Sequence, residues 1–141
     1  MPILVAAAVA STAALCDEAN DPPSVAVSLA SLPPSVVSTF PRCGDTAVAP
    51  GPAEISVTFS KEMKVTGHCW SWCGVTDDAF PERTAPTRFL DDKRTCVMTV
   101  SLQPEKTYAI WINTEQYHSF QDPQGHTAVP YLLVFRTEAA P

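Results

Sequence analysis

Basic residues are scarce in this sequence. Of its 141 residues, nine are Lys or Arg and 15 are Asp or Glu, which gives a formal net charge of −6. No cluster of basic residues occurs along the chain. A protein that binds nucleic acid needs a cationic face for the phosphate backbone, and an anionic lipid surface repels an acidic domain. We therefore expect no nucleic-acid partner and no direct binding to a membrane surface.

Catalytic and cofactor-binding motifs are also absent. The sequence has no Gly-x-Ser-x-Gly nucleophile motif, no His-Glu-x-x-His zinc motif and no phosphate-binding glycine loop. Its three histidines, His68, His118 and His126, stand in no recognised nucleophile context. We therefore expect a protein that is not an enzyme, with no catalytic residue, no cofactor and no small-molecule ligand.

No apolar run reaches the length of about 20 residues that a membrane-spanning helix needs. Residues 1–15 are apolar and rich in alanine, which is typical of a secretory signal. Cys16 follows Ala13-Ala14-Leu15, an arrangement similar to the cleavage box of a bacterial lipoprotein. We expect residues 1–16 to be a signal or lipoprotein-like segment, with Cys16 as the lipidation candidate. The alternative is an N-terminus that is never cleaved.

Glycine is rare and proline is abundant, with five and 14 residues respectively. Residues 17–35 contain two Pro-Pro pairs among Ser, Asp and Asn, which predicts an extended tether. From residue 36 onward, short apolar segments alternate with turns. The length suits one domain over residues 36–138.

Seven short segments after residue 35 have strand character. The clearest is Glu54–Ser60, where Ile55, Val57 and Phe59 alternate with serine and threonine. The others are Val36–Phe40, Lys64–Cys73, Arg88–Leu90, Cys96–Leu102, Thr107–Asn113 and Pro130–Thr137. Residues 74–87 are polar and carry no clear pattern. The sequence predicts an all-β fold, a seven-stranded antiparallel immunoglobulin-like sandwich.

Three motifs have the order and spacing of a known family. Phe59-Ser60-Lys61-Glu62-Met63 follows a strand, Leu102-Gln103-Pro104 leads into Thr107-Tyr108, and Asp122-Pro123-Gln124-Gly125 precedes the closing strand. In this order they resemble the bacterial immunoglobulin-like domain of the SbsA type, whose opening Pro-x-x-Gly stretch corresponds to Pro41–Gly44.

This resemblance implies a module of the cell envelope. It would be exported to the periplasm or the cell surface and would serve adhesion, spacing or contact with a protein or envelope component. A lipid anchor would be its sole attachment to a membrane. The resemblance also places Tyr108 where the chain crosses between sheets, with its hydroxyl bonded to nearby backbone. The Asp-x-x-Gly turn favours a positive φ at Gly125.

Four cysteines remain once Cys16 is lipidated or removed: Cys43, Cys69, Cys73 and Cys96. Four cysteines form two disulfides in three connectivities, and the sequence does not choose among them. Disulfides suit an exported protein. The alternatives are free thiols, or a soft-metal or redox site that uses Cys69 and Cys73.

Two histidines flank a loop that also contains a carboxylate. His118, Asp122 and His126 offer two imidazoles and a carboxylate, a set that suits copper. Gln124-Gly125-His126 resembles the end of a motif in periplasmic copper carriers of the CopC type. A metal-binding immunoglobulin-like domain is therefore the alternative function, and solvated loop histidines are the simpler interpretation.

Aromatic residues offer one further kind of surface. Trp70, Trp72, Trp111, Tyr117 and Tyr131 could together line a carbohydrate or peptide site. Aromatic side chains in sandwiches pack more often in the core, which is the interpretation we favour.

Overall fold

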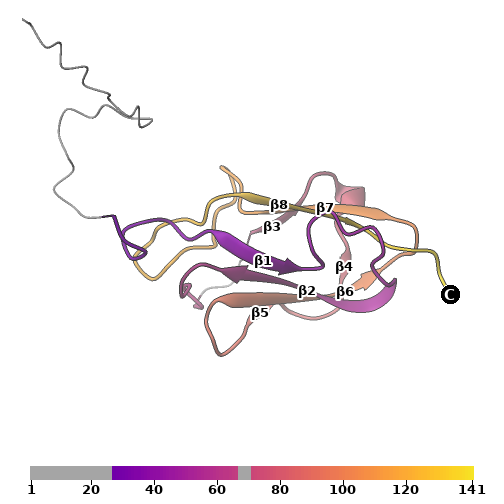
Figure 1. Ribbon diagram of the computed structural model, residues 1–141, viewed down its shortest axis with the longest axis horizontal. Coiled ribbons are helices and arrows are strands. Elements are labelled where there is room, and N and C mark those ends of the chain that lie inside the picture. The colour runs from indigo at the N-terminus through magenta and orange to yellow at the C-terminus, as the bar shows by residue number, and fades with distance from the viewer. Residues whose placement is uncertain (1–26, 67–70) are drawn as a thin grey trace, which may run out of the picture.

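The computed structural model describes residues 27–66 and 71–141, in which two antiparallel sheets pack face to face (Figure 1). The five-stranded sheet contains β1 (Val36–Phe40), β2 (Gly51–Phe59), β6 (Thr95–Leu102), β4 (Glu82–Arg83) and β5 (Arg88–Phe89). The three-stranded sheet contains β3 (Trp72–Gly74), β7 (Thr107–Ile112) and β8 (Tyr131–Arg136). One 3-10 helix, η1 (Asp77–Ala79), follows β3. The predicted all-β sandwich is confirmed. None of the helical structure in these described residues is long and apolar enough to span a membrane.

The described residues form eight strands where the sequence predicted seven. The additional strand is β4, in a segment that the sequence showed only as a polar loop. β4 and β5 both pair with the same edge of β6, through Glu82–Ser101 and Arg88–Val97. They are two halves of one edge strand, interrupted by residues 84–87, which include a proline. An edge strand has only one hydrogen-bonded side and needs no apolar pattern. The sequence pattern therefore did not predict β4.

The prediction of a strand at Lys64–Cys73 is wrong for its first residues. Residues 64–66 are not in a strand, and the observed strand, β3, starts at Trp72. Residues 67–70, the middle of that prediction, lie outside the described residues. The other six predicted strands coincide with β1, β2, β5, β6, β7 and β8 to within three residues at each end.

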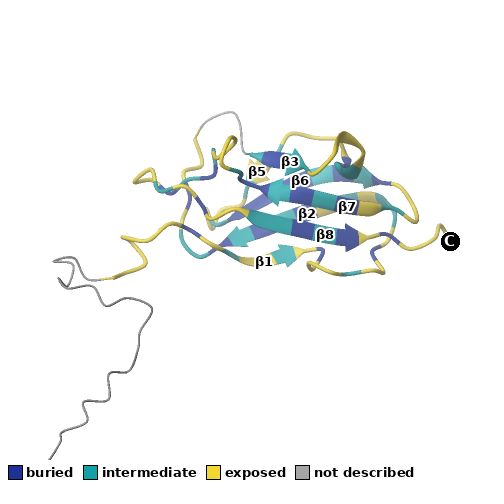
Figure 2. Cartoon of the chain, turned by 90° about the horizontal axis from the view of Figure 1, so that it is seen from above, coloured by how far each residue is buried: buried dark blue, intermediate teal, exposed yellow. Residues whose placement is uncertain are grey.

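The core forms where alternating apolar side chains of the two sheets meet. Ile55, Val57 and Phe59 of β2 are fully buried, as the alternation predicted. Their counterparts on the neighbouring strands are equally buried: Cys96, Met98 and Val100 on β6, Ile110 and Ile112 on β7, and Leu133 and Phe135 on β8. Figure 2 shows buried segments, in dark blue, on strands of both sheets, between segments that are half-buried or exposed.

Two expected turn features are confirmed. Tyr108 is 1% exposed, and its hydroxyl accepts a hydrogen bond from the backbone N–H of Gln103 at 2.8 Å. This bond fixes the connection through which the chain passes from β6 in one sheet to β7 in the other. Gly125 has φ +91, the left-handed conformation that the Asp-x-x-Gly turn requires.

The chain also changes sheets directly after its first strand. β1 pairs with β2 in the five-stranded sheet, and the following residues 44–48 lie along β8 in the three-stranded sheet. The isolated bridge between Val48 and Thr137 is parallel. The N-terminal part of the domain therefore contacts both sheets.

Part of the predicted tether is bound to the domain. Nζ of Lys61 donates to the carbonyl oxygens of Ala30 and Leu32, at 3.3 and 2.9 Å. The backbone N–H of Val129 donates to Pro34 O at 2.9 Å. Residues 30–35 are thus held by two loops at the same end of the sandwich.

Candidate interaction surface

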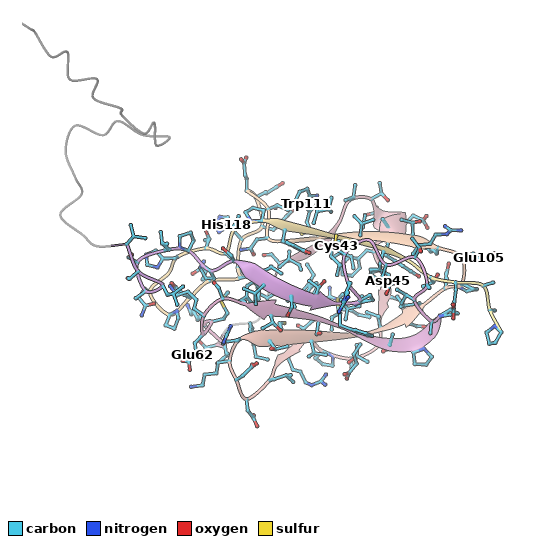
Figure 3. The ribbon with its side chains drawn as sticks, in the orientation of Figure 1. Cys43, Asp45, Glu62, Glu105, Trp111 and His118 are labelled. Atoms are coloured by element: carbon cyan, nitrogen blue, oxygen red, sulfur yellow. The ribbon has the colours of Figure 1, made fainter. Side chains whose placement is uncertain are left out.

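The outer face of the three-stranded sheet carries an apolar row. Tyr108, Ile110 and Ile112 of β7 point into the core, so Trp111 between them points outward. The strand register places Trp111 directly beside Cys73 of β3 on one side and Leu132 of β8 on the other. Figure 3 shows Trp111 on the side of this sheet that faces away from the five-stranded sheet. We call this side the outer face.

A second row extends the outer face along the strands. Ala109 pairs with Val134, and the backbone N–H of Val75 donates to Ala109 O at 3.0 Å. Val75 is 52% exposed. The two adjacent rows therefore contain aliphatic, aromatic and thiol side chains and no charged group, and all of these side chains except exposed Val75 are half-buried.

The loop after β7 folds over one end of the outer face. Thr114 N donates to Tyr117 O at 2.6 Å, and Tyr117 N donates to Thr114 Oγ1 at 2.9 Å, which closes a tight turn. Tyr117, 55% exposed, then lines an open pocket of ≈ 630 Å³ together with Trp111 and Cys73. The single charged residue in the lining of this pocket is Glu115.

The opposite side of the sandwich is more polar, although exposed Phe40 and Leu90 line an open pocket there. On the outside of the five-stranded sheet, Arg88 pairs with Glu54 at 2.9 Å, and the hydroxyls of Thr58 and Thr95 are 3.1 Å apart. An antiparallel sheet that faces water normally alternates apolar residues inside with polar residues outside. β2 follows this rule, whereas the outward positions of β7 and β8 are apolar in two successive rows and become polar at the Thr107–Arg136 pair. Contiguous exposed apolar surface in a soluble protein typically marks an interaction site.

Glycine at position 74 sets the shape of the face beside Cys73. A Cβ atom on Gly74 would lie 2.5 Å from the carbonyl oxygen of Thr76 and 2.9 Å from Cβ of Phe80. The segment that contains η1 therefore packs against the backbone of β3 more closely than any side chain would allow. This close approach positions Val75 at the edge of the outer face.

The three described cysteines, Cys43, Cys73 and Cys96, are free thiols. β7 and β8 lie between Cys73 and the segment of Cys43, whose Sγ donates to Leu132 O at 3.4 Å. Neighbouring strands lie about 4.8 Å apart, so the two intervening strands place the Cα atoms of Cys73 and Cys43 farther apart than the ~7 Å that a disulfide can span. Each predicted two-disulfide connectivity needs one bond among these three residues, so none of those connectivities is present. Cys69 and Cys16 lie outside the described residues.

Cys96 lies deep in the core. It is 0% exposed, and burial raises the pKa of its thiol to about 12. The indole of Trp72 opposes this rise and lowers the pKa of Cys96, although its Nε1 makes no hydrogen bond to any described residue. Burial also raises the pKa of Cys73. Neither thiol has the environment of a reactive cysteine.

The proposed copper ligands are only partly brought together. The ring of His126 contacts Asp122, with Nδ1 and Oδ2 2.8 Å apart. His118 lies on an exposed loop (Figure 3) and lines a pocket that includes neither His126 nor Asp122. Asp122 is already fully engaged, because Lys61 Nζ donates to Oδ2 at 2.6 Å and two backbone N–H groups donate to Oδ1. Among the described residues, no three His, Cys, Asp or Glu side chains gather as metal ligands do.

The contact between Lys61 and Asp122 joins two of the sequence motifs. Asp122 is 0% exposed, and burial alone raises the pKa of its carboxyl. The hydrogen bonds from Lys61 and His126 outweigh burial and hold this pKa well below its usual range. This pair stabilises the turn, so we assign Asp122 a structural role.

The aromatic residues divide between core and surface. Trp72 is buried and packs edge-on against Phe120, with ring centroids 5.7 Å apart. Trp111 and Tyr117 do share a surface, while Tyr131 is half-buried beside Cys43 at the other edge of the sheet. Trp70 lies outside the described residues. The sequence interpretation did not include the aliphatic members of the outer face, although the run Leu132-Leu133-Val134 is apolar at both alternating positions.

Comparison with known proteins gives a family match. The sequence model of the family described as "Bacterial Ig-like domain" matches residues 30–137. No curated protein matches the chain. Two solved structures of the surface-layer protein SbsC are similar, each with a TM-score of 0.49 and 18% sequence identity. The similarity covers 77% of this chain and 14% of the surface-layer chain.

Proposed function

Because the chain belongs to the bacterial immunoglobulin-like domain family, we propose that it is a non-catalytic module of the cell envelope that contacts a protein partner through its outer face. The observation that carries this proposal is the uncharged row Cys73–Trp111–Leu132 on a solvent-facing sheet. The resemblance noted from the sequence motifs supports the envelope location.

The composition of the outer face favours a protein as the partner. Interface centres are enriched in tryptophan and tyrosine and depleted in charge, and a few buried aromatic anchors carry most of the binding energy. Trp111 and Tyr117 are suited to this role because they share one pocket. That pocket is open, and small-molecule sites bury most of their ligand. A protein surface fits this shape better than a small ligand does.

Cross-linking in the native envelope tests the proposed contact. A photoreactive amino acid is placed at Val75, on the outer face, and at Glu54, which is exposed on the opposite side of the sandwich. We expect a discrete protein adduct from position 75 only, and we expect Trp111→Ser to reduce it at least ten-fold, equivalent to about 1.4 kcal/mol. Equal adducts from both positions, or none from position 75, would contradict the proposal.

We also propose that residues 1–16 direct export and that residues 17–35 tether the domain through a lipid on Cys16. The support is the signal-like sequence and the cysteine that follows it. Intact mass of the protein purified from its native envelope tests this. A mass that begins at Cys16 with added acyl chains is expected, and an unmodified full-length mass would refute the anchor.

A further inference from the structure

The two ends of the domain's chain, residues 27–35 and the C-terminus, lie at opposite ends of the domain's long axis. Residues 27–35 lie at one end, beside the start of β1, and the C-terminus lies at the other end (Figure 1). β1 and β8 run in the same direction between these ends (Figure 2). A force applied between the two ends therefore acts along the strands.

Backbone hydrogen bonds join the segment after β1 to the last strand. Four bonds connect residues 44–48 with residues 134–138: Gly44 N to Val134 O (2.6 Å), Arg136 N to Asp45 O (2.8 Å), Val48 N to Arg136 O (3.2 Å) and Glu138 N to Val48 O (2.9 Å). We call this set the terminal clamp. Its two segments are parallel, as the bridge between Val48 and Thr137 shows.

Each half of the clamp is also bonded to the rest of the domain. On the C-terminal side, Glu105 N donates to Glu138 O at 3.0 Å and Lys106 N donates to Thr137 Oγ1 at 2.9 Å. On the N-terminal side, Pro34 accepts from Val129, and β1 is paired with β2 along its length. Neither end can therefore move alone without breaking several bonds.

We propose that the terminal clamp makes this domain a load-bearing module, which resists unfolding when it is pulled from its two ends. When parallel segments are pulled in opposite directions along their axis, the evenly spaced hydrogen bonds between them lie across the force and are loaded together. A ladder pulled open from one end breaks one pair at a time. This property goes beyond the proposed protein contact and depends on none of the outer-face residues.

Single-molecule pulling on the full chain in two geometries tests the proposal. In the first geometry, handles are attached at residue 27 and at the C-terminus, so that the clamp is loaded in shear. In the second, the handles are at a bio-orthogonal residue replacing Glu105 and at the C-terminus. Since Glu105 lies at the same end as the C-terminus (Figure 3), this pull opens the β7–β8 ladder from its end. We expect a clearly higher unfolding force in the first geometry at the same loading rate. An equal or lower force would overturn the proposal.

A pair of proline variants separates the clamp from general stability. Glu138→Pro removes the N–H that donates to Val48 O, whereas Thr84→Pro removes the N–H that donates to Thr99 O at 2.9 Å in the edge strand away from the clamp. Under end-to-end load we expect Glu138→Pro to unfold about five-fold faster, equivalent to about 1 kcal/mol for one hydrogen bond, and Thr84→Pro to match the parent chain. If the two variants respond alike, the load does not pass through the clamp. The assay uses isolated protein without a partner, so it can fail while the cross-linking result stands.

Discussion

Replacing Lys61 with methionine removes the cation that neutralises a buried carboxylate. The side chains of Asp122 and Lys61 are 0% and 12% exposed, and the charged atoms are 2.6 Å apart. Breaking such a pair from one side costs about 3–5 kcal/mol, because the remaining charge stays buried. We expect Lys61→Met to lose about this much unfolding free energy, with a fall in Tm of about 12–25 °C.

Denaturation at pH 7 measures this loss against a matched exposed ion pair. Arg88 and Glu54 are 2.9 Å apart, but their side chains are 49% and 57% exposed, so Arg88→Met should cost less than about 1 kcal/mol. Adding Asp122→Asn to Lys61→Met removes the buried charge and should recover part of the loss. Two results would contradict this expectation. One is a loss of unfolding free energy in Lys61→Met no larger than that in Arg88→Met. The other is a double variant that loses the sum of the losses of Lys61→Met and Asp122→Asn.

The pH dependence of the same pair has a defined sign. Because the pKa of Asp122 is lowered in the folded protein, its carboxylate stabilises the fold above the unfolded pKa of about 3.9. That stability is lost as the pH falls from about 3.9 towards the folded value. The deficit of Lys61→Met should therefore be smaller at pH 3 than at pH 7.

Three further outcomes are expected. Gly74→Ala should destabilise the fold by about 1–3 kcal/mol in chemical denaturation, because the new Cβ would overlap a carbonyl oxygen 2.5 Å away; an unchanged midpoint would show that the η1 segment can move. In native protein at pH 8, a maleimide should label exposed Cys43 quickly and buried Cys96 only on unfolding, since burial raises the pKa of Cys96 to about 12; equal rates by peptide mass would contradict the burial. Calorimetric titration with Cu(II) should show no micromolar binding that depends on His126, because Asp122 beside it already binds a lysine; binding lost in His126→Ala would restore the copper hypothesis.

The core of this fold could be predicted because it depends on a local pattern. Glu54–Ser60 alternates strictly, and the burial of Ile55, Val57 and Phe59 follows from that period of two. Gly125 was also predictable from its turn, and the corner position of Tyr108 was implied by the family resemblance of its motif.

Features that depend on distant residues could not be predicted in the same way. Lys61 and Asp122 belong to two motifs that are far apart in the sequence, and only the packed structure shows that their side chains touch. The free thiols follow from strand order, because β7 and β8 separate Cys73 from Cys43. The outer face is an intermediate case. The apolar residues at both alternating positions of Leu132-Leu133-Val134 signalled it, but that pattern is equally typical of a strand buried on both sides.

The pairing of residues 44–48 with β8 has a consequence for how the domain is made. These segments lie near the beginning and at the end of the domain, so β8 must leave the ribosome, or any channel the chain passes through, before they can meet. Until then β1 can pair with β2, but residues 44–48 lack their partner, and the three-stranded sheet lacks its final strand. Contacts between such distant segments form slowly, because closing a long loop must precede them. The domain therefore closes only when its whole sequence is present, and a chain cut short before residue 131 would leave its core open to water.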